Sequence, residues 1–257
     1  QLINLYKQGQ FSLAVEQAEI LTKQYPDNFM IWNILGASAA QVDMTDEAIT
    51  AFKNVIFLNP NYANAHYNMG NILKKLGNYH EAIDAFKKAV FIQPDHAKAY
   101  GNMGVALHNQ GRLDDAIDAY KKSISLKPDF AETYSNMGNV LSDQDKMHEA
   151  IEAYKKAISI NPNYADAYSN MGTALRDQGK LDESINAFKK AITLNPNHSQ
   201  AYSNMGNTFQ DQGKLDDAIK VYLKSISLRY DYPETHKNYS LSLLQSGRIK
   251  EGLEEYE

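Results

Sequence analysis

The sequence repeats itself every 34 residues, and this period constrains the fold more than any other feature. Glycines keep the spacing from Gly36 to Gly206, and prolines keep it from Pro26 to Pro196. A period of this length is typical of arrays in which each unit packs on its neighbours. The register predicts a single array over residues 1–257. Partial repeats are expected at 1–28 and 233–257, and whole repeats at 29–62, 63–96, 97–130, 131–164, 165–198 and 199–232.

The sequence pattern of each repeat predicts two helices, as residues 165–198 illustrate. Tyr168 and Leu175 are spaced as one face of a first helix, and a second apolar stripe follows over residues 181–192. Gly179, which adopts a left-handed conformation easily, separates the two helices, and Pro196 ends the second. The sequence therefore predicts an all-α fold.

Some repeats depart from the pattern. Asp43 and Asp145 stand where the other hairpins carry glycine, so we expect these two turns to differ. Tyr230 replaces a proline and Gly252 replaces an alanine of the second helix, which predicts an irregular final repeat.

Charge and composition exclude several kinds of partner. A formal net charge of -5 argues against nucleic acid and against anionic membrane surfaces, which both attract basic proteins. No apolar run is long enough to cross a bilayer, and the first residues do not resemble a signal peptide. We therefore expect no membrane insertion and a cytoplasmic location.

The pattern of polar residues does not indicate catalysis. The seven histidines lack metal-ligand spacing, and there is no cysteine to act as ligand or nucleophile. Acid pairs such as Asp114 and Asp115 fall at the start of second helices, where they suit the helix dipole. We expect no catalytic residue, no metal and no cofactor in this chain.

The pattern Trp32-x-x-Leu35-Gly36, with a later alanine and a closing proline, resembles the tetratricopeptide repeat (TPR). More narrowly, the run over residues 201–207 is similar to repeats that precede the catalytic domain of O-linked N-acetylglucosamine transferases, and to bacterial TPR proteins. The resemblance implies a right-handed superhelix with the first helix of each repeat on the concave side. It also implies binding of an extended segment of a partner protein.

One asparagine stands two residues before the repeat glycine in almost every repeat. We call this set the ladder asparagines: Asn68, Asn102, Asn136, Asn170, Asn204 and Asn238. An amide can both donate to and accept from a peptide group, so such a row suits sequence-tolerant binding. An alternative is that these amides bond to the backbone of a neighbouring repeat and serve the fold alone.

Further polar residues lie on the same face of the first helix, three or seven residues later. Those expected to join the binding surface are Asn71, Asn139, Asn207, Asp143, Asp177 and Asp211. The early part of this face carries Lys74, Lys75 and Lys98 and the later part carries acids, an order that would orient a ligand of opposite polarity. The alternative is that these charges form an ordinary solvated face.

A basic set that clamps a C-terminal carboxylate in some relatives is not present. Ser135, Ser169 and Ser203 occupy positions of that set in three repeats, so binding of chaperone tails is not expected.

The sequence thus favours a module that binds an extended protein or peptide. Two alternatives stay open. Near-identical repeats could stack end to end through terminal repeats and self-assemble. The chain could also select substrates for a larger glycosyltransferase-like enzyme.

Overall fold

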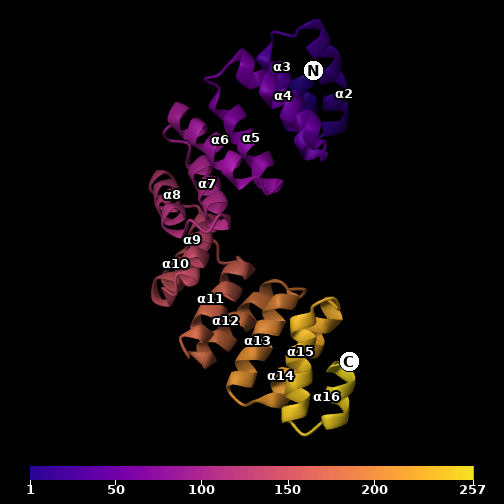
Figure 1. Ribbon diagram of the computed structural model, residues 1–257, viewed down its shortest axis with the longest axis vertical. Helices are drawn as coiled ribbons and strands as arrows, with labels where there is room; N and C mark the ends of the chain where they lie inside the picture. The colour runs from indigo at the N-terminus through magenta and orange to yellow at the C-terminus, as the bar shows by residue number, and fades with distance from the viewer. Residues whose placement is uncertain (257) are drawn as a thin grey trace. The chain divides into compact units, whose positions relative to one another are not determined.

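The computed structural model describes residues 1–256, which are helical throughout apart from short connections (Figure 1). The sixteen helices in this range are α1 (Leu2–Lys7), α2 (Phe11–Gln24), α3 (Phe29–Gln41), α4 (Thr45–Leu58), α5 (Ala63–Lys75), α6 (Tyr79–Ile92), α7 (Ala97–Asn109), α8 (Leu113–Leu126), α9 (Ala131–Asp143), α10 (Met147–Ile160), α11 (Ala165–Asp177), α12 (Leu181–Leu194), α13 (Ser199–Asp211), α14 (Leu215–Leu228), α15 (Pro233–Gln245) and α16 (Ile249–Tyr256).

The helices pair as the period predicts. From α3 onward, every odd-numbered helix has 13 residues and begins 34 residues after the previous one. The even-numbered helices α4 to α14 have 14 residues each. The all-α fold expected from the sequence is confirmed.

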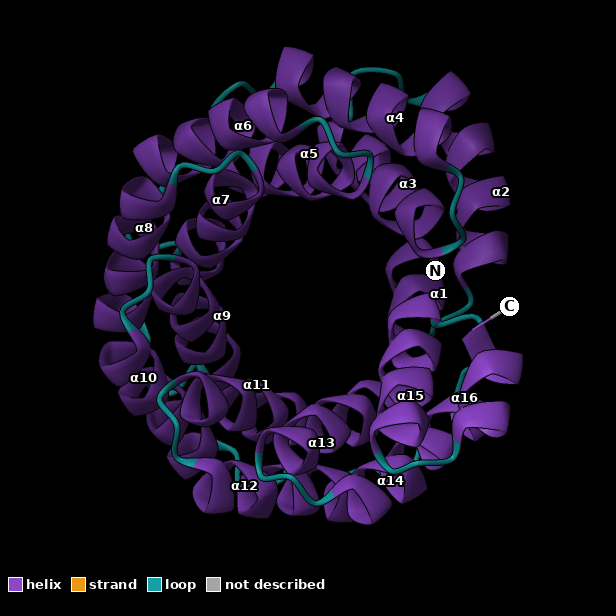
Figure 2. Ribbon diagram, turned by 60° about the horizontal axis from the view of Figure 1, so that its bottom comes forward, coloured by secondary structure: helices purple, strands orange, loops and turns teal. Residues whose placement is uncertain are grey.

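The chain divides into two compact units, Gln1–Pro128 and Asp129–Glu257, which we call unit 1 and unit 2. Within each unit the first helices of successive repeats contact one another, whereas among the described residues the second helices do not. Figure 2 shows this arrangement, with α3, α5 and α7 inside and α4, α6 and α8 outside. The first helices therefore line the concave side of each unit, as expected.

The repeat position on the first helix requires glycine because an aromatic ring of the second helix packs directly against it. A methyl group added at Gly138 would lie 2.6 Å from Cε1 of Tyr154, which is almost fully buried. At Gly172 the ring is that of Phe188, and the hydroxyl of Ser184 donates to the glycine carbonyl at 2.7 Å. These small residues let the two helices of a repeat approach closely.

The turns at Asp43 and Asp145 do not differ from the glycine turns, contrary to the expectation. Both aspartates have φ 58°, in the same left-handed region as the turn glycines. The closing bond is also the same: Lys146 N–H donates to Leu141 O at 2.9 Å, as Lys180 N–H does to Leu175 O. Aspartate tolerates this conformation better than most residues, so the turn survives the substitution.

The irregularity expected of the final repeat is confined to a connection. The second helix α14 ends at Leu228 and α15 begins at Pro233, in the first helical position that proline favours. Tyr230 is 80% exposed between them. The spacing of α15 from α13 is unchanged, so the register continues.

Candidate functional site: the inner faces of the first helices

The inner face of each unit is formed by one stripe of every first helix. We define it as the ladder asparagine together with the residues four before, three after and seven after it, which share a helix side. The six ladder asparagines are all half-buried. They therefore remain partly accessible to solvent while touching their surroundings.

Most ladder asparagines bond to a side chain of the preceding repeat. In each case Nδ2 donates to the residue 31 positions earlier, which lies three residues after the preceding ladder position. The observed pairs are Asn102 to Asn71 Oδ1 at 2.7 Å, Asn170 to Asn139 Oδ1 at 2.9 Å, Asn204 to Thr173 Oγ1 at 3.3 Å and Asn238 to Asn207 Oδ1 at 3.0 Å. We call each such pair a rung.

Through the rungs the ladder asparagines link neighbouring repeats, a structural role that takes a form the sequence did not predict. The alternative considered above was a bond to the backbone of the next repeat, whereas the partner is a side chain. Each rung uses one amide hydrogen of the asparagine. In Asn170, Asn204 and Asn238 the remaining hydrogen and the carbonyl oxygen leave capacity for a ligand, because an amide offers two donors and two acceptor sites. Asn102 has less capacity, because it also donates to Tyr67 OH and accepts from Lys74 Nζ.

Two rungs are reinforced from the second helix of the repeat. Tyr154 OH donates to Asn139 Oδ1 at 2.8 Å, and Tyr222 OH donates to Asn207 Oδ1 at 2.6 Å. Burial raises the pKa of both tyrosines far above the ordinary value, with a smaller contribution from nearby aspartates. Their hydroxyls therefore stay protonated and act as donors.

The acids expected on this face lie at the C-terminal ends of the first helices of unit 2. Asp143, Asp177 and Asp211 are all exposed there. A carboxylate at a helix C-terminus is opposed by the helix dipole. Arg176 offsets part of this cost, because it lies 3.3 Å from Asp177 and 3.6 Å from Asp211.

Charge on the inner face of unit 1 is opposite in kind. Lys75, at the C-terminal end of α5, pairs with Asp43 at 2.5 Å, and Lys98 is exposed at the start of α7. The hydrogen bond from Lys75 lowers the pKa of the Asp43 carboxyl. The charged side chains on the inner faces of the two units therefore differ in sign.

The serines compared with a carboxylate clamp do not lie on the inner face. Ser135, Ser169 and Ser203 are buried, and Ser203 Oγ bonds Thr235 Oγ1 of the next repeat at 2.8 Å. A step of one residue turns a helical side chain by about 100°, from the inner face into the contact between repeats. Those positions cannot clamp a ligand.

Several histidines have local structural tasks. His66 Nε2 bonds the carbonyl of Pro60 at 2.9 Å, as the indole of Trp32 does that of Pro26 one repeat earlier. His198 caps its helix by accepting from Ala201 N–H. Among residues 1–256, no group of His, Asp and Glu side chains is arranged to hold a metal ion.

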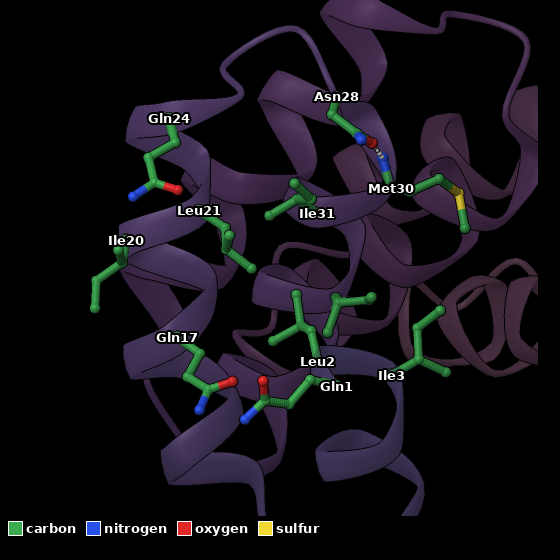
Figure 3. Close-up of a pocket in the computed structure, with 11 residues that line it drawn as sticks. Gln1, Leu2, Ile3, Gln17, Ile20, Leu21, Gln24, Asn28, Met30 and Ile31 are labelled. Atoms are coloured by element: carbon green, nitrogen blue, oxygen red, sulfur yellow. Dashed lines mark hydrogen bonds between the residues drawn. The ribbon is translucent and has the colours of Figure 1, made fainter.

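The sequence did not indicate a pocket of about 640 Å³ among α1, α2 and α3 (Figure 3). Ile3, Ile20 and Met30 line it and are about half exposed.

The length and apolar character of a helix decide whether it could cross a membrane. None of the helices in residues 1–256 combines the length and apolar character that crossing a bilayer requires.

Helix pairs at a period of 34, glycines under aromatic rings and an inner row of polar side chains define a TPR protein. Within this class, residues 4–238 match the family described as the cilia and flagella-associated protein 70 C-terminal domain, so the chain belongs to that family.

Solved structures with the same fold include Cut9 with Hcn1 in an APC/C hetero-tetramer, at a TM-score of 0.77 and 18% identity over 94% of this chain and 48% of the other. YrrB, described as a TPR protein with an unusual peptide-binding site, has a TM-score of 0.60 and 22% identity, covering 79% of this chain and all of YrrB. MamA has a TM-score of 0.58 at 30% identity, covering 63% of this chain and 95% of MamA.

Curated relatives match a shorter segment. The peroxisomal targeting signal receptors of Candida glabrata and Candida albicans are each 30% identical over 74 residues. That segment is 29% of this chain and only 12% of each receptor. The chain thus matches only a small part of these receptors.

Proposed function

We propose that the chain is a protein-interaction module that binds extended polypeptide segments on the inner faces of its units, and that it acts by binding rather than catalysis. The observation that carries the proposal is the row of half-buried amides on the first helices, of which Asn170, Asn204 and Asn238 keep hydrogen-bonding capacity beyond their rungs. Because the rungs fix these three amides in place, a ligand would not have to order them.

The comparisons support the same class of function. YrrB is described as having a peptide-binding site, and the matched receptors of the two Candida species are receptors for a targeting signal. An extended chain advances about 3.3 Å per residue and packed helices lie roughly 8–10 Å apart, so about every third ligand residue would meet a new first helix.

The charges on the inner face of each unit would favour some polypeptide segments over others. The exposed aspartates of unit 2 favour basic residues opposite them, and the exposed Lys98 of unit 1 favours an acidic one. Hydrogen bonds between the ladder amides and the peptide groups of the ligand would contribute affinity in either unit, whatever the charge of the ligand.

A selection experiment tests the proposal. Random 15-residue peptides displayed on phage are selected on the chain, and those enriched are synthesised and titrated by calorimetry. Gln200→Trp places a bulky side chain on the inner face of α13, four residues before Asn204, and should weaken binding to unit 2 at least tenfold.

The matched control is Ser227→Trp on α14 of the same unit. Ser227 is exposed, and Phe57 and Phe91 stand at its position in two other repeats, so an aromatic residue is tolerated there. This variant should bind like the unmodified chain. Equal weakening by both variants, or by neither, would reject the inner face as the binding surface.

A further inference from the structure

A second, smaller pocket of about 240 Å³ opens on the inner face of unit 1 among α1, α3 and α5. Asn68 and Asn71 of α5 form its polar side, and Ala37 and Ala40 of α3 line it together with Phe52. We call it the Asn68 pocket. Unlike the larger pocket, it interrupts the ladder itself.

The pocket lies where a rung is missing. One repeat later, Asn102 is held by Asn71 Oδ1 at 2.7 Å, by Tyr67 OH at 3.2 Å and by Lys74 Nζ at 3.3 Å. The residues at those three positions around Asn68 are Asn33, Ala37 and Ala40. The two alanines have no polar side-chain atom, so the rung cannot form, and the space of two longer side chains stays open.

Asn68 is consequently the ladder member of unit 1 whose amide is free. Its side chain makes no hydrogen bond within residues 1–256, although it is half-buried. The Asn68 side-chain atoms are not among the buried polar atoms without a partner, so solvent hydrates this amide in the free chain. A ligand that supplies both a donor and an acceptor would replace that solvent without breaking a rung.

The lining also selects the kind of group that fits. The alanine methyl groups and the Phe52 ring are apolar, and Lys75 at the rim is paired with Asp43. No unpaired charge in the lining therefore demands a charged occupant. A peptide group beside an aliphatic side chain matches both the amide and the apolar surface.

We propose that the Asn68 pocket anchors one residue of the bound segment, with an aliphatic side chain of about leucine or methionine size against Ala37 and Ala40. The adjoining peptide group pairs with the Asn68 amide. The inference rests on the proposed function in taking a polypeptide as the ligand, and it adds a defined anchor residue to otherwise sequence-tolerant recognition.

The test uses N-acetyl-leucine N-methylamide as a probe, titrated into the chain with ¹³C-labelled alanine methyl groups. The methyl signals of Ala37 and Ala40 and the side-chain amide signal of Asn68 should shift in a saturable way. N-acetyl-glycine N-methylamide, which lacks the side chain, should bind at least tenfold more weakly.

Two variants close the pocket with residues that the chain already uses. Ala37→Asn reproduces Asn71 and rebuilds the rung, and Ala40→Lys reproduces Lys74. Each should abolish the saturable shift, and the second keeps the test valid if the first does not fold. Thr173→Asn, a rung change in unit 2, is the control and should leave the titration unchanged.

The outcomes separate this inference from the proposed function. An absent shift in the unmodified chain, or an equal shift in both pocket variants or with the glycine probe, would overturn the anchor. Selected peptides that bind the inner face while the probe does not would remove the anchor alone. A probe that binds while Gln200→Trp leaves peptide binding unaffected would instead remove the proposed function.

Discussion

Tyr222 and Asn238, which come from different repeats, donate to the same oxygen. The tyrosine hydroxyl lies 2.6 Å from Asn207 Oδ1, and the amide of Asn238 lies 3.0 Å from it. One side chain of α13 thereby joins α14 and α15. Asn139 does the same for α10 and α11, through Tyr154 and Asn170. The ladder is part of the contact between repeats as well as of the surface they present.

Removing a rung should destabilise the array, whereas removing the free amide should not. Asn102→Ala leaves Asn71 without its donor and should cost about 1–2 kcal/mol of unfolding free energy. Asn68→Ala should cost less than about 0.5 kcal/mol, as for a surface change. Urea unfolding followed by circular dichroism measures both. Equal losses would mean that the rung contributes nothing of its own.

The glycine under each aromatic ring should tolerate alanine to a degree set by the available space. At Gly138 the added methyl group would lie 2.6 Å from Tyr154 Cε1, and at Gly36 it would lie 3.0 Å from Phe52. Gly138→Ala should lower the free energy of unfolding by about 1–3 kcal/mol because the buried ring must move. Gly36→Ala should lower it less, and thermal unfolding of the two variants checks the order.

Glycine should stabilise the turns that now carry aspartate. Asp145 holds a left-handed φ of 58°, which costs an L-residue about 1 kcal/mol. Asp145→Gly should therefore raise the midpoint of thermal unfolding. Asp43→Gly should raise it less, because Lys75 would lose its partner. A lower midpoint for Asp145→Gly would contradict this account of the turn.

The last helix should dock less firmly as the pH rises. Burial opposes protonation of His236, but hydrogen bonds to Glu255 and the Tyr230 carbonyl outweigh it and raise its pKa. A raised folded pKa gives stability that is present below the unfolded value of about 6.5 and is lost as pH rises through the folded value. Hydrogen exchange of α16 amides, corrected for its intrinsic pH dependence, should accelerate between pH 6 and 8. His236→Gln should remove this pH dependence.

The period alone predicted the fold, because glycine and proline series fix where each helix begins and ends. The ladder positions were also predictable, since Asn170 and its equivalents lie on one side of their helices. The rungs were not, because the pairing of Asn170 with Asn139 depends on how far one repeat is offset from the next. The Asn68 pocket requires the same offset, which brings Ala37 and Ala40 beside Asn68.

Ser135 shows the limit of reading a helix face by analogy. Its position in the repeat suggested an inner-face location, but it lies one residue from the ladder and points into the buried contact. A pattern of polar residues does not distinguish these two directions when small hydroxyl side chains can be buried.

Photo-crosslinking of a selected peptide measures most directly which face binds polypeptide. p-Benzoylphenylalanine is introduced at Gln200 on the inner face of α13, or at Lys220 on α14, both of which are exposed. After irradiation, mass spectrometry should find the peptide attached to the chain labelled at position 200 and not to that labelled at 220. Attachment at position 220 alone, or equally at both, would contradict binding on the inner face.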